Sequence, residues 1–264
     1  MIRRSNRGAA VALLLACSAP HALAGEAPRG FDHSTWNRLL ATHVDSRGQV
    51  AYRALQENDL PALRQYLDAL ADAEPGAWPR DEQLAFWINA YNAGLVWAVL
   101  HGESAESAAG RDRLFKSWKF RVAGHERTPD EIEHQILRPH FAEPRIHFAI
   151  VCASASCPRL RTEAYVGAKL DAQLDAQARD FIRDPTRNVI DPATKTLRLS
   201  AVFDWFHADF EKVAGSVPAF VARYAADPEA RNWLLSGPEK IEHLDYDWTL
   251  NAQPAQRPLA RRGS

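Results

Sequence analysis

The chain has 264 residues, of which 46% are hydrophobic and 25% are charged, as in an ordinary globular protein. This composition excludes collagen-like, low-complexity and disulfide-scaffold proteins. The formal net charge is −1, but three arginines stand in the first eight residues and three in the last eight, so the part between them is acidic. This acidic central part argues against nucleic-acid binding, because a protein that binds the phosphate backbone presents a basic face.

The first 24 residues have the order of a secretory signal peptide. Three arginines precede an apolar stretch, and Ala22-Leu23-Ala24 is a small-x-small cleavage site. Cleavage after Ala24 predicts a periplasmic or secreted protein. The alternative is a lipoprotein acylated at Cys17, because Leu14–Cys17 resembles a lipobox. No apolar run reaches the roughly 18 residues that a membrane-spanning helix needs, so the sequence predicts no membrane span.

One domain is expected over residues 29–251, since no internal repeat or long linker divides them. Residues 252–264 contain proline and arginine but no aromatic residue, which is typical of a disordered tail. Amphipathic helices are predicted at 34–42 and 60–71. Residues 81–100 are apolar nearly all round, with Asp81 as the expected N-cap, and this pattern predicts a helix buried in the middle of the domain.

The second half of the chain predicts an α+β fold, rich in helix, with a small antiparallel sheet. Thr128 and Glu131 form a capping box with proline at the first helical position, so a helix should begin there and end before Pro139. The other expected elements are strands at 113–122, 145–152 and 241–248, a helix at 168–182, a hairpin at 188–200 that turns at Asp191-Pro192, and further helices between 201 and 240.

Cys157 is the leading candidate for chemistry. It follows a run of small residues and precedes Pro158, a good first residue for a helical turn. A cysteine at a helix N-terminus is a better nucleophile, because the helix dipole and free N–H groups stabilise its thiolate. The alternative is a packed or disulfide-bonded cysteine. Cys152 is expected to point from its strand into the core, so the two thiols should remain unpaired.

His147 is the natural base for such a thiol, since it lies ten residues earlier on the expected strand with small neighbours on its face. A third residue would fix the imidazole tautomer, and we assign this role to Glu133. Glu131 belongs to the capping box, and Glu133 lies about 200° further around the helix. Each residue also has a simpler interpretation, the histidine as a packed residue and the glutamate as part of a solvated helix face.

A metal site is the other possibility for the histidines. His134, His140 and His147 with either cysteine match neither a helical zinc motif nor paired C-x-x-C knuckles. The sequence therefore predicts no metal, and without a phosphate loop or dinucleotide fingerprint it predicts no cofactor. Asn89 and Asn92 are amides in an apolar helix, so they must find partners if buried. They either brace a loop, which the sequence favours, or donate to an oxyanion.

Several sequence blocks are spread over about residues 34–251. They are Phe86–Asn92, Ile132–His134 with Leu137-Arg138, His147–Cys152 running into Ser156–Pro158, Phe203–Trp205, Tyr246–Trp248 and Leu250-Asn251. Together these blocks resemble the domain-of-unknown-function 547 family. The family is grouped with papain-like and transglutaminase-like cysteine peptidases, so the resemblance implies a papain-like fold with Cys157 as nucleophile, His147 as base and Glu133 as orienting acid. Family members often have glycine where this chain has Ala153.

The resulting hypothesis is an exported thiol hydrolase or acyl transferase that acts on amide bonds. Its expected partner is a peptide, isopeptide or γ-glutamyl-type small molecule, and Asn89, Asn92 and Ser156 are candidates for substrate binding or oxyanion support. The alternative is a binding module without turnover, which would hold a peptide or glycan on the aromatic surface near Trp205 and Trp248. The sequence does not indicate the oligomeric state.

Overall fold

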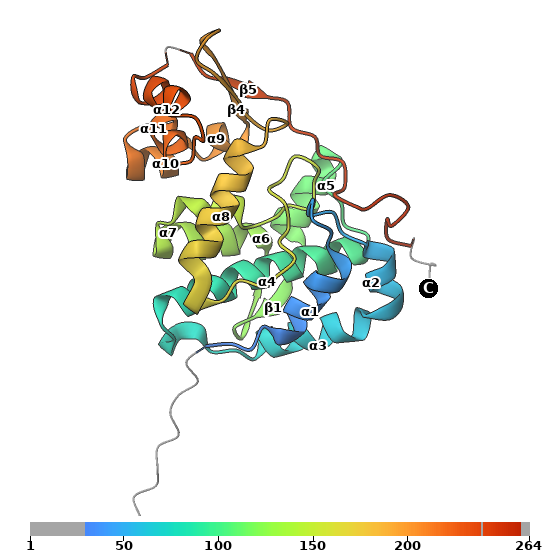
Figure 1. The fold of residues 1–264 in the computed structure, drawn as a ribbon. Helices are drawn as coiled ribbons and strands as arrows, with labels where there is room; N and C mark the ends of the chain where they lie inside the picture. The colour runs from blue at the N-terminus through green and yellow to red at the C-terminus, as the bar shows by residue number, and fades with distance from the viewer. Residues whose placement is uncertain (1–29, 239, 260–264) are drawn as a thin grey trace, which may run out of the picture.

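The fold is built around one buried helix, α4 (Arg80–Leu100). The computed structural model describes residues 30–238 and 240–259, and the predicted signal peptide and Cys17 lie outside them (Figure 1). Nearly every residue of α4 from Leu84 onward is buried, because the helix is covered on all sides. The N-terminal part of the chain supplies the first of the surrounding elements. They are α1 (Ser34–His43), α2 (Tyr52–Asn58), α3 (Leu60–Ala71) and the 3-10 turn η1 (Pro75–Ala77).

The middle of the chain consists of short elements packed against α4. The π-helical turn η3 (Ile132–Leu137) continues α6 without a break, and η4 is a single 3-10 segment (Pro144–Phe148). The remaining elements of this part are α5 (Ala108–Asp112), the π-helical turn η2 (Arg113–Ser117), β1 (Phe120–Val122), β2 (His125–Arg127), α6 (Pro129–Glu131), α7 (Arg138–Phe141) and η5 (Gly167–Lys169).

The last third of the chain forms a second group of helices beside a small sheet. Figure 1 shows this group at the upper end of the molecule, joined to the rest by the long helix α8 (Leu170–Arg183). The other elements are β3 (Val189–Asp191), β4 (Thr196–Ser200), α9 (Val202–Trp205), α10 (His207–Ala214), α11 (Val217–Ala222), α12 (Pro228–Leu235) and β5 (Glu242–Leu244).

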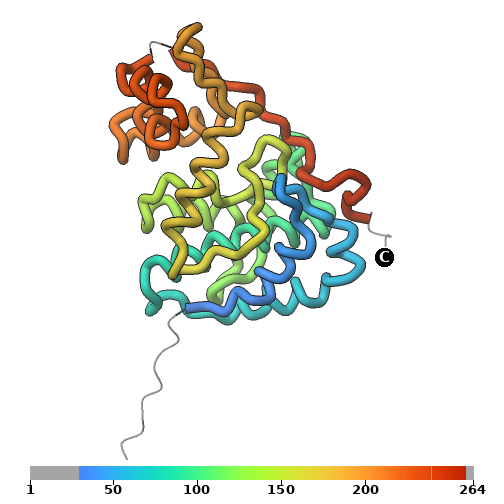
Figure 2. Tube along the Cα trace, viewed as in Figure 1, coloured from blue at the N-terminus to red at the C-terminus, as the bar shows by residue number. Residues whose placement is uncertain are grey.

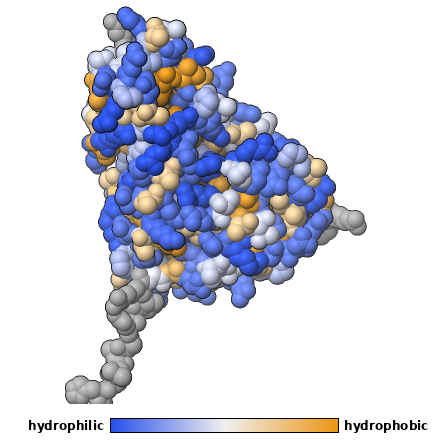
Figure 3. Space-filling view, viewed as in Figure 1, coloured by the Kyte–Doolittle hydropathy of each residue, from blue (hydrophilic) through white to orange (hydrophobic). Residues whose placement is uncertain are grey.

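Two hydrophobic clusters hold the molecule together. The larger one surrounds α4, and the smaller one joins Phe148 of η4 to Phe203, Phe210 and Phe220. Polar residues cover most of the face in Figure 3, while hydrophobic residues gather near its top, where the second group of helices lies. Among the described residues, no helix is long and apolar enough to cross a membrane.

The sheets are small. β1 and β2 form an antiparallel pair, and β4 lies between β3, which is antiparallel to it, and β5, which is parallel to it. The α+β class rich in helix is therefore confirmed, whereas the expectation of a purely antiparallel sheet is wrong. β5 reaches β4 only after four intervening helices, so its direction depends on the tertiary path and not on a local hairpin.

The residues after β5 cross from the second cluster to the first. Figures 1 and 2 show this segment passing beside the loop after η4 and ending near α2. We call residues 245–253 the C-terminal strap. Backbone hydrogen bonds join Thr249 to Ala155 at 2.7 Å and Asn251 to Ala153 at 3.1 Å, and the Asn251 carbonyl accepts from Val50 at 2.9 Å. Gln253 and Gln256, in the tail predicted at 252–264, bond to Val50, Arg53 and Ala54 beside and within α2. Residues 260–264 of that tail lie outside the described residues.

Most predicted helices are confirmed, as are the hairpin and the capping box of Thr128. Two details at helix ends are wrong. Asp81 lies in the first turn of α4, and Pro79 occupies the N-cap position. Pro139 does not end the helix, which continues to Phe141. The proline follows the π-helical turn η3, where the regular hydrogen-bond ladder is already interrupted, so its missing N–H costs little there.

The expected strand at 145–152 is wrong. Pro144 starts a 3-10 segment, and the Glu143 side chain caps it by accepting from the Arg145 N–H. Beyond it, the amide of Asn92 bonds to the carbonyl of Ala149 and the N–H of Val151, both at 2.9 Å. A side chain thus takes the place of a neighbouring strand. The expected strand at 113–122 is reduced to β1, because η2 occupies its first half.

Candidate functional site

A cavity of about 210 Å³ lies where the two clusters meet. Its walls come from α4, η2, α6, η3, η4 and the loop after it, α9 and the C-terminal strap. The lining is Tyr91, Phe115, Lys116, Asp130, Glu133, His134, His147, Ile150, Cys152, Cys157, Pro158, Val202, Trp205, Phe206, Tyr246 and Trp248. The three residues that the sequence suggested for catalysis therefore meet at one cavity.

The two cysteines in this cavity are joined by a disulfide, with 6.2 Å between their α-carbons, contrary to the expectation that they remain unpaired. That expectation assumed a strand that aims Cys152 into the core. The chain instead turns sharply at Ala153, whose φ of 59° is in the left-handed region, and Cys157 returns toward Cys152. The helix expected after Pro158 is also absent, since residues 158–166 contain no helix or strand.

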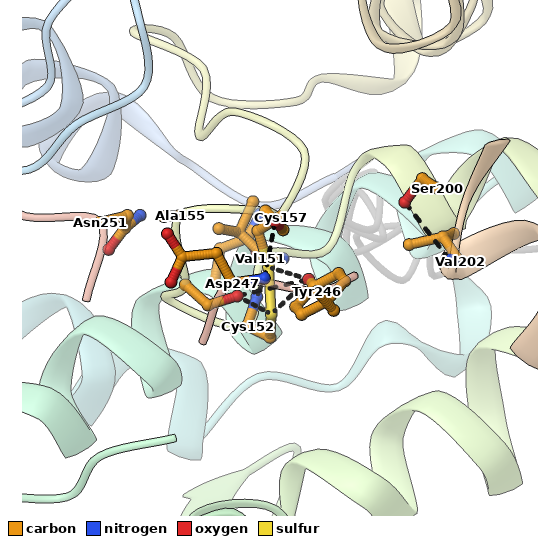
Figure 4. Close-up of a disulfide and its surroundings, with 12 residues drawn as sticks. Val151, Cys152, Ala155, Cys157, Ser200, Val202, Tyr246, Asp247 and Asn251 are labelled. Carbon is orange, nitrogen blue, oxygen red and sulfur yellow. Dashed lines mark hydrogen bonds between the residues drawn. A yellow bond between two sulfur atoms is a disulfide. The ribbon is translucent and has the colours of Figure 1, made fainter. Parts of the chain in front are cut away.

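Polar groups surround the two sulfur atoms (Figure 4). The Tyr246 hydroxyl lies 3.2 Å from Cys152 Sγ and 3.3 Å from Cys157 Sγ, and the backbone N–H of Cys152 donates to Cys157 Sγ at 2.9 Å. The Ser154 hydroxyl lies 3.0 Å from Cys152 Sγ. Burial raises the pKa of Tyr246 to about 12, so this hydroxyl keeps its proton at neutral pH. Cys157 is buried, whereas Cys152 is half-buried.

His147 lies between two carboxylates. Its Nε2 is 2.8 Å from Asp209 Oδ2, which is a hydrogen bond, and its Nδ1 is 3.5 Å from Glu133 Oε1. The ring stacks on Phe206 with 3.8 Å between centroids, and its side chain has no solvent exposure. Nδ1 has no hydrogen-bond partner among the described residues. The histidine is therefore fixed by its Nε2 side, and Nδ1 keeps free hydrogen-bonding capacity.

Asp209 was not among the residues that the sequence suggested. It lies on α10, where Arg138 contacts both of its oxygens, at 2.7 and 3.1 Å. The hydrogen bonds from His147 and Arg138 hold the pKa of Asp209 well below its ordinary value. Asp209 is 62 residues from His147, and only the packing of α10 beside η4 brings them together. No local motif marks such a pair.

Glu131 and Glu133 point to different surroundings, as their spacing predicted. The Glu131 carboxylate accepts the Thr128 N–H at 2.8 Å, and the Thr128 hydroxyl accepts the Glu131 N–H at 3.1 Å. The side chain of Glu133 is 12% exposed and lines the cavity. No lysine or arginine nitrogen lies within ion-pair distance of Glu133 in the described part of the chain. Its nearest ionic neighbour is thus His147.

Asn89, Asn92 and Ser156 each bond to backbone. The amide of Asn89 bonds to the Tyr165 carbonyl and N–H at 2.7 and 3.0 Å, as Asn92 does for Ala149 and Val151. The Ser156 hydroxyl accepts the Asp247 N–H at 2.9 Å. None of the three lines the cavity. The geometry gives both asparagines the bracing role that the sequence favoured and makes Ser156 a contact of the C-terminal strap.

Comparison with known proteins bears on part of this site. Residues 75–182 match the model of a family described as "Protein of unknown function, DUF547". The match supports the resemblance drawn from the sequence blocks and contains Glu133, His147 and both cysteines. It ends before Trp205 and Tyr246, which line the cavity, and before Asp209, which bonds to His147. Neither the curated proteins nor the solved structures gave a match. Residues 30–238 and 240–259 contain no group of three or more His, Cys, Asp or Glu that could hold a metal ion.

Proposed function

We propose that this cavity is the active site of a thiol-dependent hydrolase or acyl transferase that acts on amide bonds. The observation that carries the proposal is the gathering of two sulfurs, a fixed imidazole and a carboxylate on one cavity whose other walls are aromatic. A thiolate and a nearby imidazole are the pair that covalent acyl transfer needs. The resemblance to papain-like peptidases, which the sequence blocks suggest, agrees with this chemistry.

The nucleophile in this proposal is Cys157, released when a dithiol reductant opens the disulfide. Reduction consumes one dithiol, which becomes a disulfide, and leaves two free thiols on the chain. In the disulfide form, the Cys152 N–H and the Tyr246 hydroxyl donate to Cys157 Sγ. Such donors favour the thiolate at the moment the disulfide opens, before the side chain turns toward His147. The surroundings of buried Cys157 therefore suit a nucleophile better than those of Cys152. The disulfide to Cys152 blocks the Cys157 sulfur reversibly.

His147 acts as the base through Nδ1, which requires the Cys157 side chain to turn toward the ring after reduction. The sequence assigned the orienting role to Glu133, but the hydrogen bond at 2.8 Å comes from Asp209. Asp209 therefore fixes the tautomer with the proton on Nε2, leaving Nδ1 free to accept a proton. Arg138 holds Asp209 in place through both carboxylate oxygens.

The reaction proceeds through a thioester. His147 Nδ1 takes the proton of the Cys157 thiol, and the thiolate attacks the amide carbonyl and forms a C–S bond. The C–N bond breaks, and the departing amine takes that proton from His147. Water or a second amine then attacks the thioester, the C–S bond breaks, and His147 accepts the proton of the attacking group. The Tyr246 hydroxyl lies beside the sulfur and is suited to donate to the oxyanion, since Asn89 and Asn92 are occupied by backbone.

Turnover with and without a dithiol tests this proposal. The reduced chain should release amine from peptide, isopeptide or γ-glutamyl amides, and the oxidised chain should not. Cys157→Ala should abolish turnover, whereas Cys152→Ala should be active without a reductant because Cys157 cannot be covered. Full activity of the oxidised chain, or of Cys157→Ala after reduction, contradicts the mechanism.

A binding module is the second candidate, because the disulfide occupies both sulfurs and an aromatic wall is open to solvent. Trp205 is 45% exposed and stacks on Trp248 with 5.7 Å between ring centroids. Such a wall suits a peptide or glycan. Ligand binding that is the same before and after reduction, without release of amine from any amide class, would favour this function over catalysis.

Export is part of the proposal and rests on the N-terminal sequence alone. Mass spectrometry of the protein recovered outside the cytoplasm should find Gly25 as its first residue. An acylated Cys17 at the N-terminus would make the protein a lipoprotein instead.

A further inference from the structure

The cavity is lined by both charged side chains and aromatic rings. Two carboxylates, Glu133 and Asp130, line it together with Lys116 and His134. Lys116 is already paired with Asp112 at 3.0 Å. His134 is 3.7 Å from Asp130 and 2.9 Å from Arg138. Among the described residues, Glu133 therefore has no lysine or arginine partner, and its ionisable neighbour is His147.

A carboxylate in this position is costly unless a charge or hydrogen bond compensates it, because its side chain is only 12% exposed. His147 does not supply a hydrogen bond, since Nδ1 is 3.5 Å away and has no hydrogen-bond partner among the described residues. A completely buried imidazole and a largely buried carboxylate therefore both have unused hydrogen-bonding capacity at the same end of the cavity.

Another part of the lining is made of aromatic rings. Trp205, Tyr246 and Trp248 contact one another with 4.5 to 5.7 Å between centroids. This cluster already attracts a cation, because the guanidinium of Arg111 lies 4.5 Å from the Trp248 centroid, although Arg111 does not line the cavity. On the cavity side, the faces of these rings offer an apolar surface to the stem of a ligand.

We propose that the cavity selects a ligand with an ammonium or guanidinium group on an apolar or aromatic stem, with the cation at Glu133 and the stem on Trp205 and Trp248. A closed apolar cavity of about 150 Å³ holds benzene, so a space of about 210 Å³ suits one group the size of an amino-acid side chain. If the proposed catalysis is correct, the preferred amide substrate carries such a cation beside the scissile bond. The binding preference itself does not depend on turnover.

Three probes of similar shape and different charge test the selectivity. Benzylammonium, benzyl alcohol and benzoate are titrated into the full, oxidised chain by calorimetry. Benzylammonium should bind at least about tenfold more tightly than benzyl alcohol, which corresponds to about 1.4 kcal/mol, and benzoate should bind most weakly. Added salt should weaken the binding of benzylammonium but not of benzyl alcohol.

Variants identify the groups responsible. Glu133→Gln should reduce the preference for benzylammonium over benzyl alcohol to about onefold, while Glu131→Gln, two residues away in the capping box, should leave it unchanged. Trp205→Ala should weaken both ligands, and this exposed position tolerates truncation if Glu133→Gln fails to fold. The proposal is overturned if benzylammonium and benzyl alcohol bind equally tightly, or if no probe binds. It is also overturned if Trp205→Ala binds both ligands as tightly as the wild type.

The two proposals fail in different ways. Charge selectivity without release of amine by the reduced chain leaves the cation site standing and removes the catalytic function. Release of amine from neutral and cationic amides at equal rates, together with equal binding of the probes, removes the cation site and leaves the thiol chemistry standing.

Discussion

The buried helix α4 and the cavity both place polar side chains in apolar surroundings, but they treat them differently. In α4, Asn89 and Asn92 each pair with one carbonyl and one N–H of a loop. At the cavity, Glu133 has no cationic side chain of lysine or arginine within ion-pair distance among the described residues, and Nδ1 of His147 has no hydrogen-bond partner there. Satisfied groups make a scaffold, whereas groups with spare capacity are available to a ligand.

Replacement of Asp209 should have the largest effect. Asp209→Asn keeps the shape but removes the charge that fixes the Nε2–H tautomer of His147. The corresponding change in a serine triad lowers kcat about 10⁴-fold, and we expect a loss of that order in the reduced chain. Amide turnover measures it, and Asp204→Asn on neighbouring α9 is the control. If Asp209→Asn turns over amides within a fewfold of the wild type, Asp209 does not orient His147 for catalysis.

Removal of an α4 amide should be the largest change in stability. Asn92→Ala leaves the Ala149 carbonyl and the Val151 N–H buried without a partner, and each such group costs about 1–3 kcal/mol. The free energy of unfolding should fall by about 2–6 kcal/mol in a denaturant titration. Asn37→Ala removes one part-buried hydrogen bond, to the Ala164 N–H, and should cost less, about 0.5–1.5 kcal/mol. Equal losses in the two variants would show that burial does not set the cost.

The two glutamates of α6 and η3 separate stability from function. Glu131→Ala removes the acceptor of the Thr128 N–H from the capping box and should cost roughly 0.5–2 kcal/mol by analogy with other caps, with turnover preserved. Glu133→Gln should change the melting temperature little and lower turnover of cationic amides. Thermal melts and amine release on both variants decide between these roles. The assignment is wrong if Glu133→Gln turns over cationic amides like the wild type.

Acid should destabilise the junction of the two clusters. The pKa of Asp209 is lowered in the folded state by His147 and Arg138, so the folded chain binds fewer protons than the unfolded chain below about pH 4. The contribution is complete above that pH and is lost as the pH falls. Asp209 is partly exposed, so we expect about 1 kcal/mol or less. Unfolding curves of Asp209→Asn should depend less steeply on pH in this range than those of the wild type.

The smallest expected effect is at the turn between the cysteines. Ala153 has a φ of 59°, a conformation that costs a non-glycine residue roughly 1–2 kcal/mol. Ala153→Gly removes this strain but adds freedom to the unfolded chain, so a net gain of about 0.5–1 kcal/mol is expected. Calorimetric melts test it, with Ala155→Gly as the control. A loss of stability at Ala153→Gly as large as at Ala155→Gly would contradict the strain at this position.

Local patterns in the sequence determined the helices, the capping box of Thr128 and the separation of Glu131 from Glu133. These features depend on residues within a few positions of one another, so apolar periodicity and cap chemistry suffice to predict them. The burial of α4 also followed from its sequence, because a helix that is apolar on every side must be covered by other elements.

Tertiary structure alone decided how the candidate site is completed. Residues 145–152 alternate like a strand, but Asn92 of α4 takes the place of a neighbouring strand, and the chain turns back at Ala153 to join Cys152 to Cys157. Asp209 and Tyr246 reach the site across 62 and 89 residues. Contacts over such distances depend on how whole elements pack, and the residues themselves carry no local signal of them.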